Sequence, residues 1–213
     1  MKYLIFADVH GNLPALENVI KKEKDVDGYV NIGDVVNYGP WSNECVDLIS
    51  NLHNCTSILG NHEEYFLNKK CNVKNNIVQS FFNHNINDFN RYDEIRSYLK
   101  DYQIGNLYFT HTVDDHTYIY NDTKIEIDKN IILAHSHQQY FRHINNFLLL
   151  NPGSVGQNRK FINVSNYIIW DTESCEFELK YLCFSVDLLI NEMKSKNFPE
   201  ICLNYYKSKK IFL

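Results

Sequence analysis

Five short motifs rich in aspartate, asparagine and histidine occur along the chain, nearly all where an apolar run ends. They are Asp8-Val-His10, Gly33-Asp34-Val-Val-Asn37, Gly60-Asn61-His62-Glu63, Thr110-His111 and Ala134-His135-Ser136-His137. A carboxylate and an imidazole two residues apart are common by chance, whereas five such motifs in succession are not. Carboxylate, amide and imidazole groups are ligands of divalent metal ions. The motifs therefore predict a two-metal site that hydrolyses phosphate esters.

The chemistry expected of such a site follows from the charge of the ions. Two divalent ions about 3.5–4 Å apart can share a bridging hydroxide, which attacks phosphorus while both ions neutralise the developing negative charge. Such a pair needs one bridging carboxylate, for which Asp34 is the natural candidate, and a mixture of oxygen and imidazole ligands. An acidic protein, with a net charge of −5, must supply positive charge locally to act on anions, and bound metals would do so.

The apolar pattern indicates the elements that must position these motifs. Residues 2–7, 29–32 and 56–59 are predicted strands, each ending at one of the first three motifs, and helical spacing follows the first two. Successive β-α repeats imply parallel strands whose carboxyl ends meet at one edge of a sheet. Ligands that are distant in sequence thus become neighbours in space.

The remainder of the chain predicts a second layer of strands. Residues 64–101 have helical spacing and are expected to form a helical insertion beside the site. From residue 107 to 184 strands dominate, and we expect a second, mixed sheet stacked on the first. Residues 186–206 are predicted to form one or two closing helices. The length favours a single α/β domain over residues 1–213.

Composition and charge exclude several classes of protein. The net charge and the absence of a long basic block argue against stable binding of nucleic acid, and Lys207 to Lys210 is expected to be a solvated end. No apolar run approaches the ~20 residues that span a bilayer. The six cysteines form no Cys-x-x-Cys pair and the first residues begin a strand, so we expect a cytoplasmic protein with buried thiols.

From Asp8 to Arg159 the motifs resemble those of the calcineurin-like metallophosphoesterase superfamily. Two further stretches, Asn151-Pro152-Gly153-Ser154-Val155-Gly156 and Asn43-Glu44-Cys45-Val46, are similar to its small bacterial phosphodiesterase-like branch. The resemblance implies a four-layer αββα sandwich of two mixed β-sheets flanked by helices. The order of the motifs is specific to the family, but it does not identify a substrate.

The resemblance also implies a role for each motif residue. Asp34 would bridge the metals, with Asp8, His10 and His137 completing one site and Asn61, His111 and His135 the other. His62 would be the general acid that protonates the leaving oxygen. His116 could compete with His111, which is favoured because Thr110-His111 directly follows an apolar run. Mn²⁺, Fe²⁺, Zn²⁺, Ni²⁺ and Co²⁺ all accept these ligands, and Mn²⁺ is preferred here.

Other residues near the motifs have two interpretations each. Asn37 could contact the substrate phosphate or only form the turn, and Arg159 could meet an anionic substrate or form a surface salt bridge. Residues 153–156 are predicted to form a tight turn that exposes backbone N–H groups near the metals. Tyr38 stands one place beyond the tyrosine ligand of purple acid phosphatases, so a ferric-tyrosinate enzyme is not expected.

These observations favour a metal-dependent phosphoesterase that acts on a small phosphate ester, with diesters preferred over phosphoproteins by resemblance alone. An alternative within the class is hydrolysis of dinucleoside polyphosphates or nucleotides. Its nucleoside pocket would use aromatic residues of the helical segment, namely Phe66, Phe81, Phe82 and Phe89. A second alternative is a non-catalytic scaffold on the same fold, which the intact ligand positions and His62 disfavour.

Overall fold

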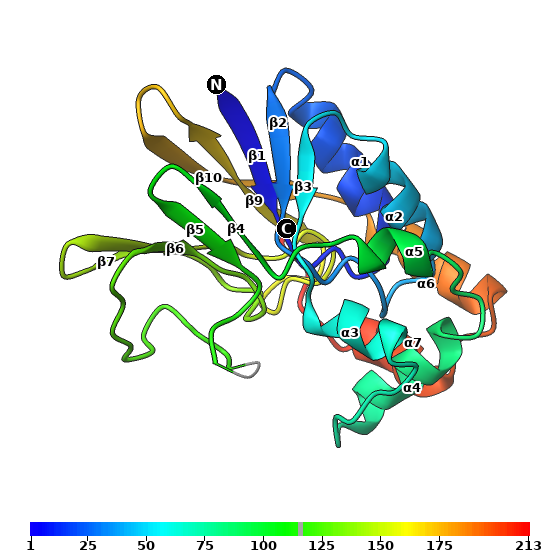
Figure 1. Ribbon diagram of the computed structural model, residues 1–213. Helices are drawn as coiled ribbons and strands as arrows, with labels where there is room; N and C mark the ends of the chain where they lie inside the picture. The colour runs from blue at the N-terminus through cyan, green and yellow to red at the C-terminus, as the bar shows by residue number, and fades with distance from the viewer. Residues whose placement is uncertain (115–116) are drawn as a thin grey trace.

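The computed structural model describes residues 1–114 and 117–213, so His116 lies outside the described residues. Two five-stranded sheets pack face to face, with helices gathered along one side of the sandwich (Figure 1). The first sheet has the order β10-β9-β1-β2-β3. Its strands are β1 (Lys2–Phe6), β2 (Gly28–Asn31), β3 (Cys55–Ser57), β9 (Val164–Asp171) and β10 (Glu176–Cys183).

The second sheet has the order β4-β5-β6-β8-β7. Its strands are β4 (Asp101–Ile104), β5 (Leu107–Thr110), β6 (Asn130–Ile132), β7 (Gln139–Ile144) and β8 (Phe147–Pro152). The helices are α1 (Leu13–Lys22), α2 (Ser42–Ser50), α3 (Asn61–Leu67), α4 (Asn76–Asn85), α5 (Tyr92–Arg96), α6 (Val186–Ser195) and α7 (Glu200–Lys207). The predicted sandwich of two mixed sheets flanked by helices is confirmed.

The first three strands are parallel and adjacent, as the β-α repeats predict. The prediction that all strands after residue 107 belong to the second sheet was wrong. β9 pairs antiparallel with β1, and β10 pairs antiparallel with β9, so both extend the first sheet. β4 was also not predicted, because the helical pattern was extended as far as residue 101.

Alternate residues of each strand divide the core into layers, as the two-residue period of a strand requires. Ile5, Val30 and Ile132 face the space between the sheets, whereas Leu4 and Phe6 of β1 pack against the helices. The outer face of the second sheet carries Ile131 and side chains of the irregular segment 117–127. This segment, rather than a helix, covers that face among the described residues.

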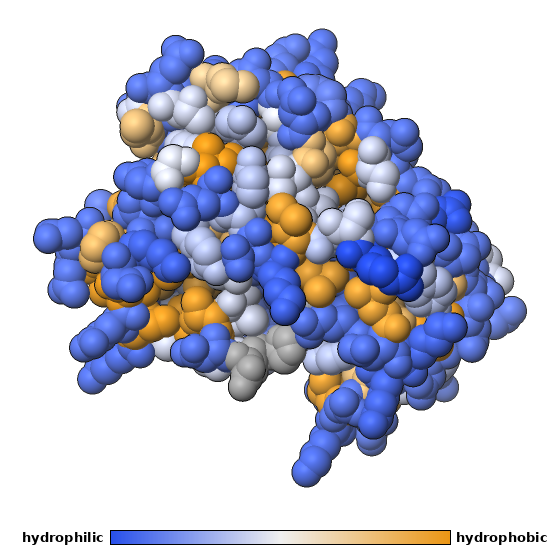
Figure 2. Space-filling model, viewed as in Figure 1, coloured by the Kyte–Doolittle hydropathy of each residue, from blue (hydrophilic) through white to orange (hydrophobic). Residues whose placement is uncertain are grey.

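The surface in the view of Figure 2 is mainly hydrophilic, with apolar side chains in separate patches between polar ones. Within residues 1–114 and 117–213, every helix is too short or too polar to cross a membrane. All six cysteines have free thiols, as predicted. The thiols were also predicted to be buried, but only Cys45 and Cys202 are. Cys175 and Cys183 are exposed on the hairpin that extends the first sheet.

Candidate metal centre

The loops that follow β1, β2, β3, β5 and β6 bring all seven predicted metal ligands together. Each ligand side chain belongs to a residue that is at most 5% exposed. The ligands are Asp8, His10, Asp34, Asn61, His111, His135 and His137. Since ionisable groups are rarely buried without partners, this cluster of buried carboxylates and imidazoles requires charge compensation inside the protein.

Most of these ligands have a left-handed backbone conformation. The φ angle is 51° at Asp8, 49° at His10, 56° at Asp34, 66° at His135 and 56° at His137. This conformation costs an L-residue roughly 1–2 kcal/mol, although Asp, Asn and His tolerate it better than most residues. The bend at each position turns a short side chain inward as soon as the strand has ended. Strain of this kind is characteristic of functional sites.

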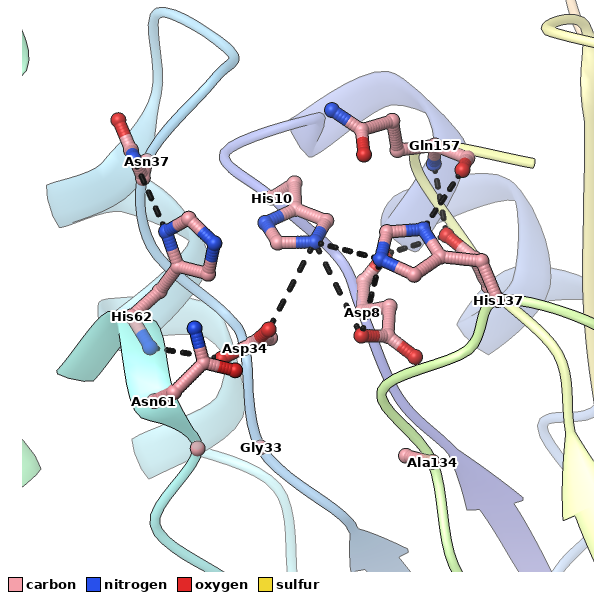
Figure 3. Close-up of polar contacts among 12 residues, drawn as sticks. Asp8, His10, Gly33, Asp34, Asn37, Asn61, His62, Ala134, His137 and Gln157 are labelled. Atoms are coloured by element: carbon pink, nitrogen blue, oxygen red, sulfur yellow. Dashed lines mark hydrogen bonds and ion pairs between the residues drawn. The ribbon is translucent and has the colours of Figure 1, made fainter. Parts of the chain in front are cut away.

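The buried side chains form three overlapping groups of possible ligands, one of which, made of His10, Asp34 and His62, shares a residue with each of the other two. Asp8, His10 and His137 form the first group (Figure 3). The Nε2 atom of His137 lies 3.5 Å from Oδ1 of Asp8 and 3.3 Å from Nε2 of His10. Neither carboxylate oxygen of Asp8 accepts a hydrogen bond from the residues that the structure describes. A fully buried carboxylate of this kind, faced by two imidazoles, fits a bound cation.

Asp34, His111 and His135 form the second group, whose ligand atoms lie within 4.8 Å of one another. Oδ2 of Asp34 is 3.3 Å from Nε2 of His111, and that nitrogen is 3.2 Å from Oδ1 of Asn61. The same Oδ2 atom is 3.9 Å from Nε2 of His10 in the first group. Asp34 is thus the carboxylate that lies between the two groups.

Three of the histidines share one hydrogen-bonding pattern, in which Nδ1–H donates to a backbone carbonyl oxygen. The acceptors are Val36 for His10 at 3.3 Å, Ile32 for His111 at 2.7 Å, and Gln157 for His137 at 2.8 Å. A carbonyl can only accept, so the proton is on Nδ1 and the lone pair of Nε2 points into the cluster. Histidines that bind metals are usually oriented in this way.

His62 has the opposite tautomer. Its Nδ1 atom is 2.9 Å from the amide nitrogen of Asn37, which can only donate, so the ring proton of neutral His62 is on Nε2 (Figure 3). The amide orientation of Asn37 is fixed in turn by Asn85 of α4, which donates to Oδ1 of Asn37 at 3.3 Å. The backbone N–H of His62 donates to Oδ1 of Asp34 at 2.9 Å. His62 therefore presents an N–H group to the cluster, whereas those three histidines present a lone pair.

Burial and charge change the ionisation of the cluster when no metal is bound. Burial raises the pKa of Asp8 well above its ordinary value. Burial also acts to raise the pKa of Asp34, but the positive charges of His111 and His62 hold it well below the ordinary value. For His111, burial acts to lower the pKa, but the charge and hydrogen bond of Asp34, the charge of Asp8 and the hydrogen bond to Ile32 together raise it to about 10. A proton on His111 then supplies the positive charge that a metal ion would bring.

Glu63 holds two of the ligand loops together, a role that the sequence analysis missed. Its Oε1 atom accepts from the backbone N–H of Val35 at 2.7 Å and of Val36 at 3.1 Å. Its Oε2 atom accepts from Asp34 at 2.8 Å and from Gly60 at 2.9 Å. The spacing of Gly60 and Glu63 is that of a helix N-cap and its third residue, a signal available in the sequence.

The two loops joined by Glu63 approach each other so closely that only glycine fits between them. A Cβ atom on Gly33 would lie 2.6 Å from the backbone nitrogen of Gly60, and a Cβ atom on Gly60 would overlap Asp34. Gly33 also has a φ of 82°, which disfavours any other residue. The glycines of both motifs therefore permit the close approach that places Asp34 beside Asn61.

The prediction that residues 153–156 expose backbone N–H groups toward the metals was wrong. The N–H of Val155 donates to the carbonyl of Ala7 at 3.0 Å, and that of Gly156 donates to the carbonyl of Asp8 at 3.1 Å. The hydroxyl of Ser154 donates to the same carbonyl of Asp8 at 2.7 Å. These donors are used within the protein, and the segment fixes the Asp8 loop instead of offering an anion site.

Three residues with uncertain roles in the sequence now have defined surroundings. Asn37 forms the turn, with a φ of 73°, and also positions His62. Arg159 extends to the metal centre, where its Nη2 atom is 3.4 Å from Nε2 of His137. Tyr38 packs edge-on against the His10 ring at 4.8 Å, and burial raises the pKa of its phenol, so it remains protonated. This agrees with its exclusion as a tyrosinate ligand.

The alternative that the helical segment forms a nucleoside pocket was wrong. The aromatic side chains proposed to stack on a base are core residues, exposed by 5% or less. They are Phe66, Phe81, Phe82 and Phe89. A cavity of about 700 Å³ opens elsewhere, beside His137 and Arg159.

Comparison with known proteins identifies the family. The family model for calcineurin-like phosphoesterases matches residues 1–180, most of the chain. The protein belongs to the calcineurin-like phosphoesterase family. Members of this family are phosphoesterases that use divalent metal ions, so this calcineurin-like protein is a phosphoesterase, and its groups of buried carboxylates and imidazoles are candidate metal sites.

Relatives of this calcineurin-like phosphoesterase share its fold over nearly the whole chain. An uncharacterised protein of Methanocaldococcus jannaschii is 28% identical, and the match covers 92% of this chain and 93% of that protein. A metallophosphoesterase from Sphaerobacter thermophilus is 23% identical, with a TM-score of 0.81 over 98% of this chain and 99% of that one. A hypothetical protein from Pyrococcus horikoshii OT3 is 12% identical, with a TM-score of 0.80 over 96% and 97%.

Proposed function

We propose that this protein is a phosphodiesterase with two divalent metal ions, in which His62 donates a proton to the leaving oxygen. The observation that carries the proposal is the difference in tautomer between the histidines. His10, His111 and His137 direct lone pairs into the cluster, as ligands must, whereas His62 directs an N–H toward it.

The two ligand groups assign the residues that would hold the ions. Asp8, His10 and His137 would bind one ion, and Asn61, His111 and His135 the other, with Asp34 shared between them. When bound, divalent ions supply positive charge for the phosphoryl oxygens and lower the pKa of water. Manganese is the metal that we favour, since mixed oxygen and imidazole sites accept it.

The protein's own residues supply proton transfer and orientation. The Nε2–H of His62 would protonate the departing alkoxide, a step that typically contributes ~10²–10⁴-fold to the rate. Asn37 keeps this proton on Nε2 because its amide hydrogen occupies Nδ1. Arg159, which reaches His137, would contact a phosphoryl oxygen and help to orient the ester.

The cavity beside His137 favours a diester over a monoester. A diester carries a second organic group on phosphorus, and this cavity of about 700 Å³ provides space for one next to the ligands. Pockets of ~300–1,000 Å³ are typical of small-molecule sites.

The test is hydrolysis of bis-p-nitrophenyl phosphate and of p-nitrophenyl phosphate, each with Mn²⁺ and after removal of metal. We expect the diester to be hydrolysed faster, and we expect the activity to be lost without metal. His62→Ala should lower kcat by roughly 10²-fold or more for a diester with an alkoxide leaving group, and by less for bis-p-nitrophenyl phosphate, because p-nitrophenolate needs little protonation to depart. Faster hydrolysis of the monoester would instead make the protein a phosphomonoesterase, and no turnover with any divalent metal would contradict the proposal.

Hydrolysis of dinucleoside polyphosphates is a second candidate, favoured by the adjacent cations Arg159 and Lys160 at the cavity. Such substrates carry several phosphates in a row and need positive charge beyond the metals. Diadenosine tetraphosphate should then be cleaved with a higher kcat/KM than bis-p-nitrophenyl phosphate. The reverse order would favour the simple diester.

A further inference from the structure

The cavity beside the metal centre is lined by several exposed aromatic side chains. Tyr120, Tyr181 and Phe212 are exposed on its walls, with a largest exposed fraction of 58% at Tyr181, and Phe161 beside them is half-buried. The Phe212 ring meets the rings of Phe161 and Tyr181 at centroid distances of 5.2 and 6.1 Å. Exposed aromatic side chains grouped around a cavity mark a binding surface, since isolated protein surfaces seldom gather them.

The tyrosine wall of the cavity is continuous with the metal centre. Tyr118 stacks on the ligand His135 at 4.2 Å, and the ring of Tyr120 is nearly parallel to that of Tyr118. The segment is held in place by β7 and the residue before it. Gln138 accepts from the backbone N–H of Asn121 at 2.9 Å, and Arg142 donates to the carbonyl of Tyr120 at 3.3 Å. The aromatic surface is therefore built into the fold.

Two cations provide the charge of the cavity. Arg159 and Lys160 are both exposed, and none of the lining residues is acidic. Throughout residues 1–114 and 117–213, no carboxylate lies within ion-pair distance of either side chain. Such a concentration of positive charge in a protein with a net charge of −5 favours an anionic ligand.

The floor of the cavity is polar and uncharged. Asn158 donates to Asn166, Asn166 donates to Gln139 at 3.2 Å, and Gln139 donates to the carbonyls of β9 and β10. These amides satisfy one another and hold the floor rigid. Val164 is the one aliphatic residue among the lining side chains that the structure describes. An acyl chain would find few partners on such a surface, whereas a flat polar ring would find many.

We propose that this cavity binds the nucleoside part of a phosphodiester substrate, with the base against the aromatic wall and the phosphate directed past Arg159 to the metal centre. The inference rests on the proposed phosphodiesterase function, because the phosphate must reach the metals. Stacking on aromatic rings suits any base, since every base has a π-face, so the cavity selects nucleosides without selecting one base. Lys160 accommodates a further phosphate on the nucleoside.

The experiment compares diesters that share the p-nitrophenolate leaving group. Methyl p-nitrophenyl phosphate has no group for the cavity, whereas thymidine 5′-p-nitrophenyl phosphate has a nucleoside. We expect kcat/KM for the thymidine ester to be at least roughly tenfold higher, a typical value of stacking one base. Tyr181→Ala should remove most of this preference without changing hydrolysis of the methyl ester, and Tyr181→Phe should retain it.

Phe141→Ala is the matched control, because Phe141 is also an exposed aromatic residue and lines a separate cavity of about 690 Å³. It should leave both rates unchanged. Calorimetric titration of metal-free protein with thymidine 5′-monophosphate gives a readout that is independent of catalysis. We expect binding by wild type and by Phe141→Ala, with a loss of roughly tenfold in affinity for Tyr181→Ala.

The outcomes separate this inference from the proposed function. Equal kcat/KM values for both esters, unaffected by Tyr181→Ala, would overturn the nucleoside cavity while metal-dependent hydrolysis remained. A higher kcat/KM for p-nitrophenyl phosphorylcholine than for the thymidine ester would assign the cavity to a lipid headgroup and also overturn the nucleoside cavity. If no diester were hydrolysed, the proposed function would fail. The titration alone would then decide whether the cavity binds a nucleoside.

Discussion

Glu63 is the residue on which the relative position of the Asp34 and Asn61 loops depends. Its carboxylate accepts four backbone N–H groups, and Gln can offer only one oxygen to them. We expect Glu63→Gln to lower the free energy of unfolding by about 2–4 kcal/mol, since each hydrogen bond to a charged group contributes roughly 1.5–3 kcal/mol. Urea denaturation would measure this change.

Phosphoesterase activity should fall together with stability in Glu63→Gln, because the loops that carry Asp34 and Asn61 are no longer held in register. Glu178→Gln is the control, since the Glu178 side chain is 69% exposed. It should change neither quantity by a measurable amount. An unaltered unfolding free energy in Glu63→Gln would show that the loops are held by other contacts.

Residue types at strand ends, together with the resemblance of the motifs to the family, predicted which side chains gather at the centre, because carboxyl ends of parallel strands share an edge. The tautomers could not be predicted in this way. They depend on the carbonyls of Val36, Ile32 and Gln157, and each of these comes from a loop distant in sequence from its histidine. The turn at 153–156 was misjudged for the same reason, since its N–H groups meet carbonyls of the β1 loop.

Helix α4 is connected to His62, the proposed proton donor, through two asparagines. Asn85 donates to Asn37, whose amide then faces Nδ1 of His62. We expect Asn85→Ala to lower kcat by about tenfold for a methyl or nucleoside leaving group, as for other residues that orient a functional histidine. A p-nitrophenolate leaving group needs little protonation, so its kcat should change less. The ratio of the two rates is the measurement.

Asn83→Ala is the control for α4, because Asn83 is exposed on the same helix. It should leave the ratio of rates as in wild type. If Asn85→Ala lowered both rates equally, the connection would be structural only. In that case α4 would support the site without orienting His62.

The elements themselves were predicted where a local pattern sufficed. β1, β2 and α1 follow from apolar runs and from helical spacing, but the sheet to which a strand belongs is a long-range property. β9 and β10 read as ordinary strands in sequence, and nothing local indicates that they pair beside β1. The local sequence pattern likewise did not predict that residues 117–127 cover the second sheet.

For the molecule as a whole, metal binding should raise stability, because buried charged ligands from both sheets converge on the centre. An ion at ~100 times its Kd contributes about 2.7 kcal/mol to unfolding. That corresponds to a rise in Tm of about 5–10 °C for a chain of this size. Thermal unfolding of metal-free protein, with and without Mn²⁺, tests this expectation.

Asp34→Asn should abolish most of this rise in Tm, because it removes the carboxylate that lies between the two ligand groups. Ca²⁺, which prefers oxygen ligands over imidazole, should give a smaller rise than Mn²⁺. If no transition metal raised the Tm above that of the metal-free protein, the metal centre itself would be contradicted.

The pairing of β1 with both β2 and β9 has a consequence for synthesis of the protein. Ile5 pairs with Val30 on one side and with Ile168 on the other, so one neighbour of β1 emerges from the ribosome long after the strand itself. Until then β1 is an unprotected edge in a nascent β-α-β unit, the kind of edge that recruits strands of other chains. The topology that brings the candidate ligands together thus leaves one edge of β1 open until residues 164–171 have been synthesised.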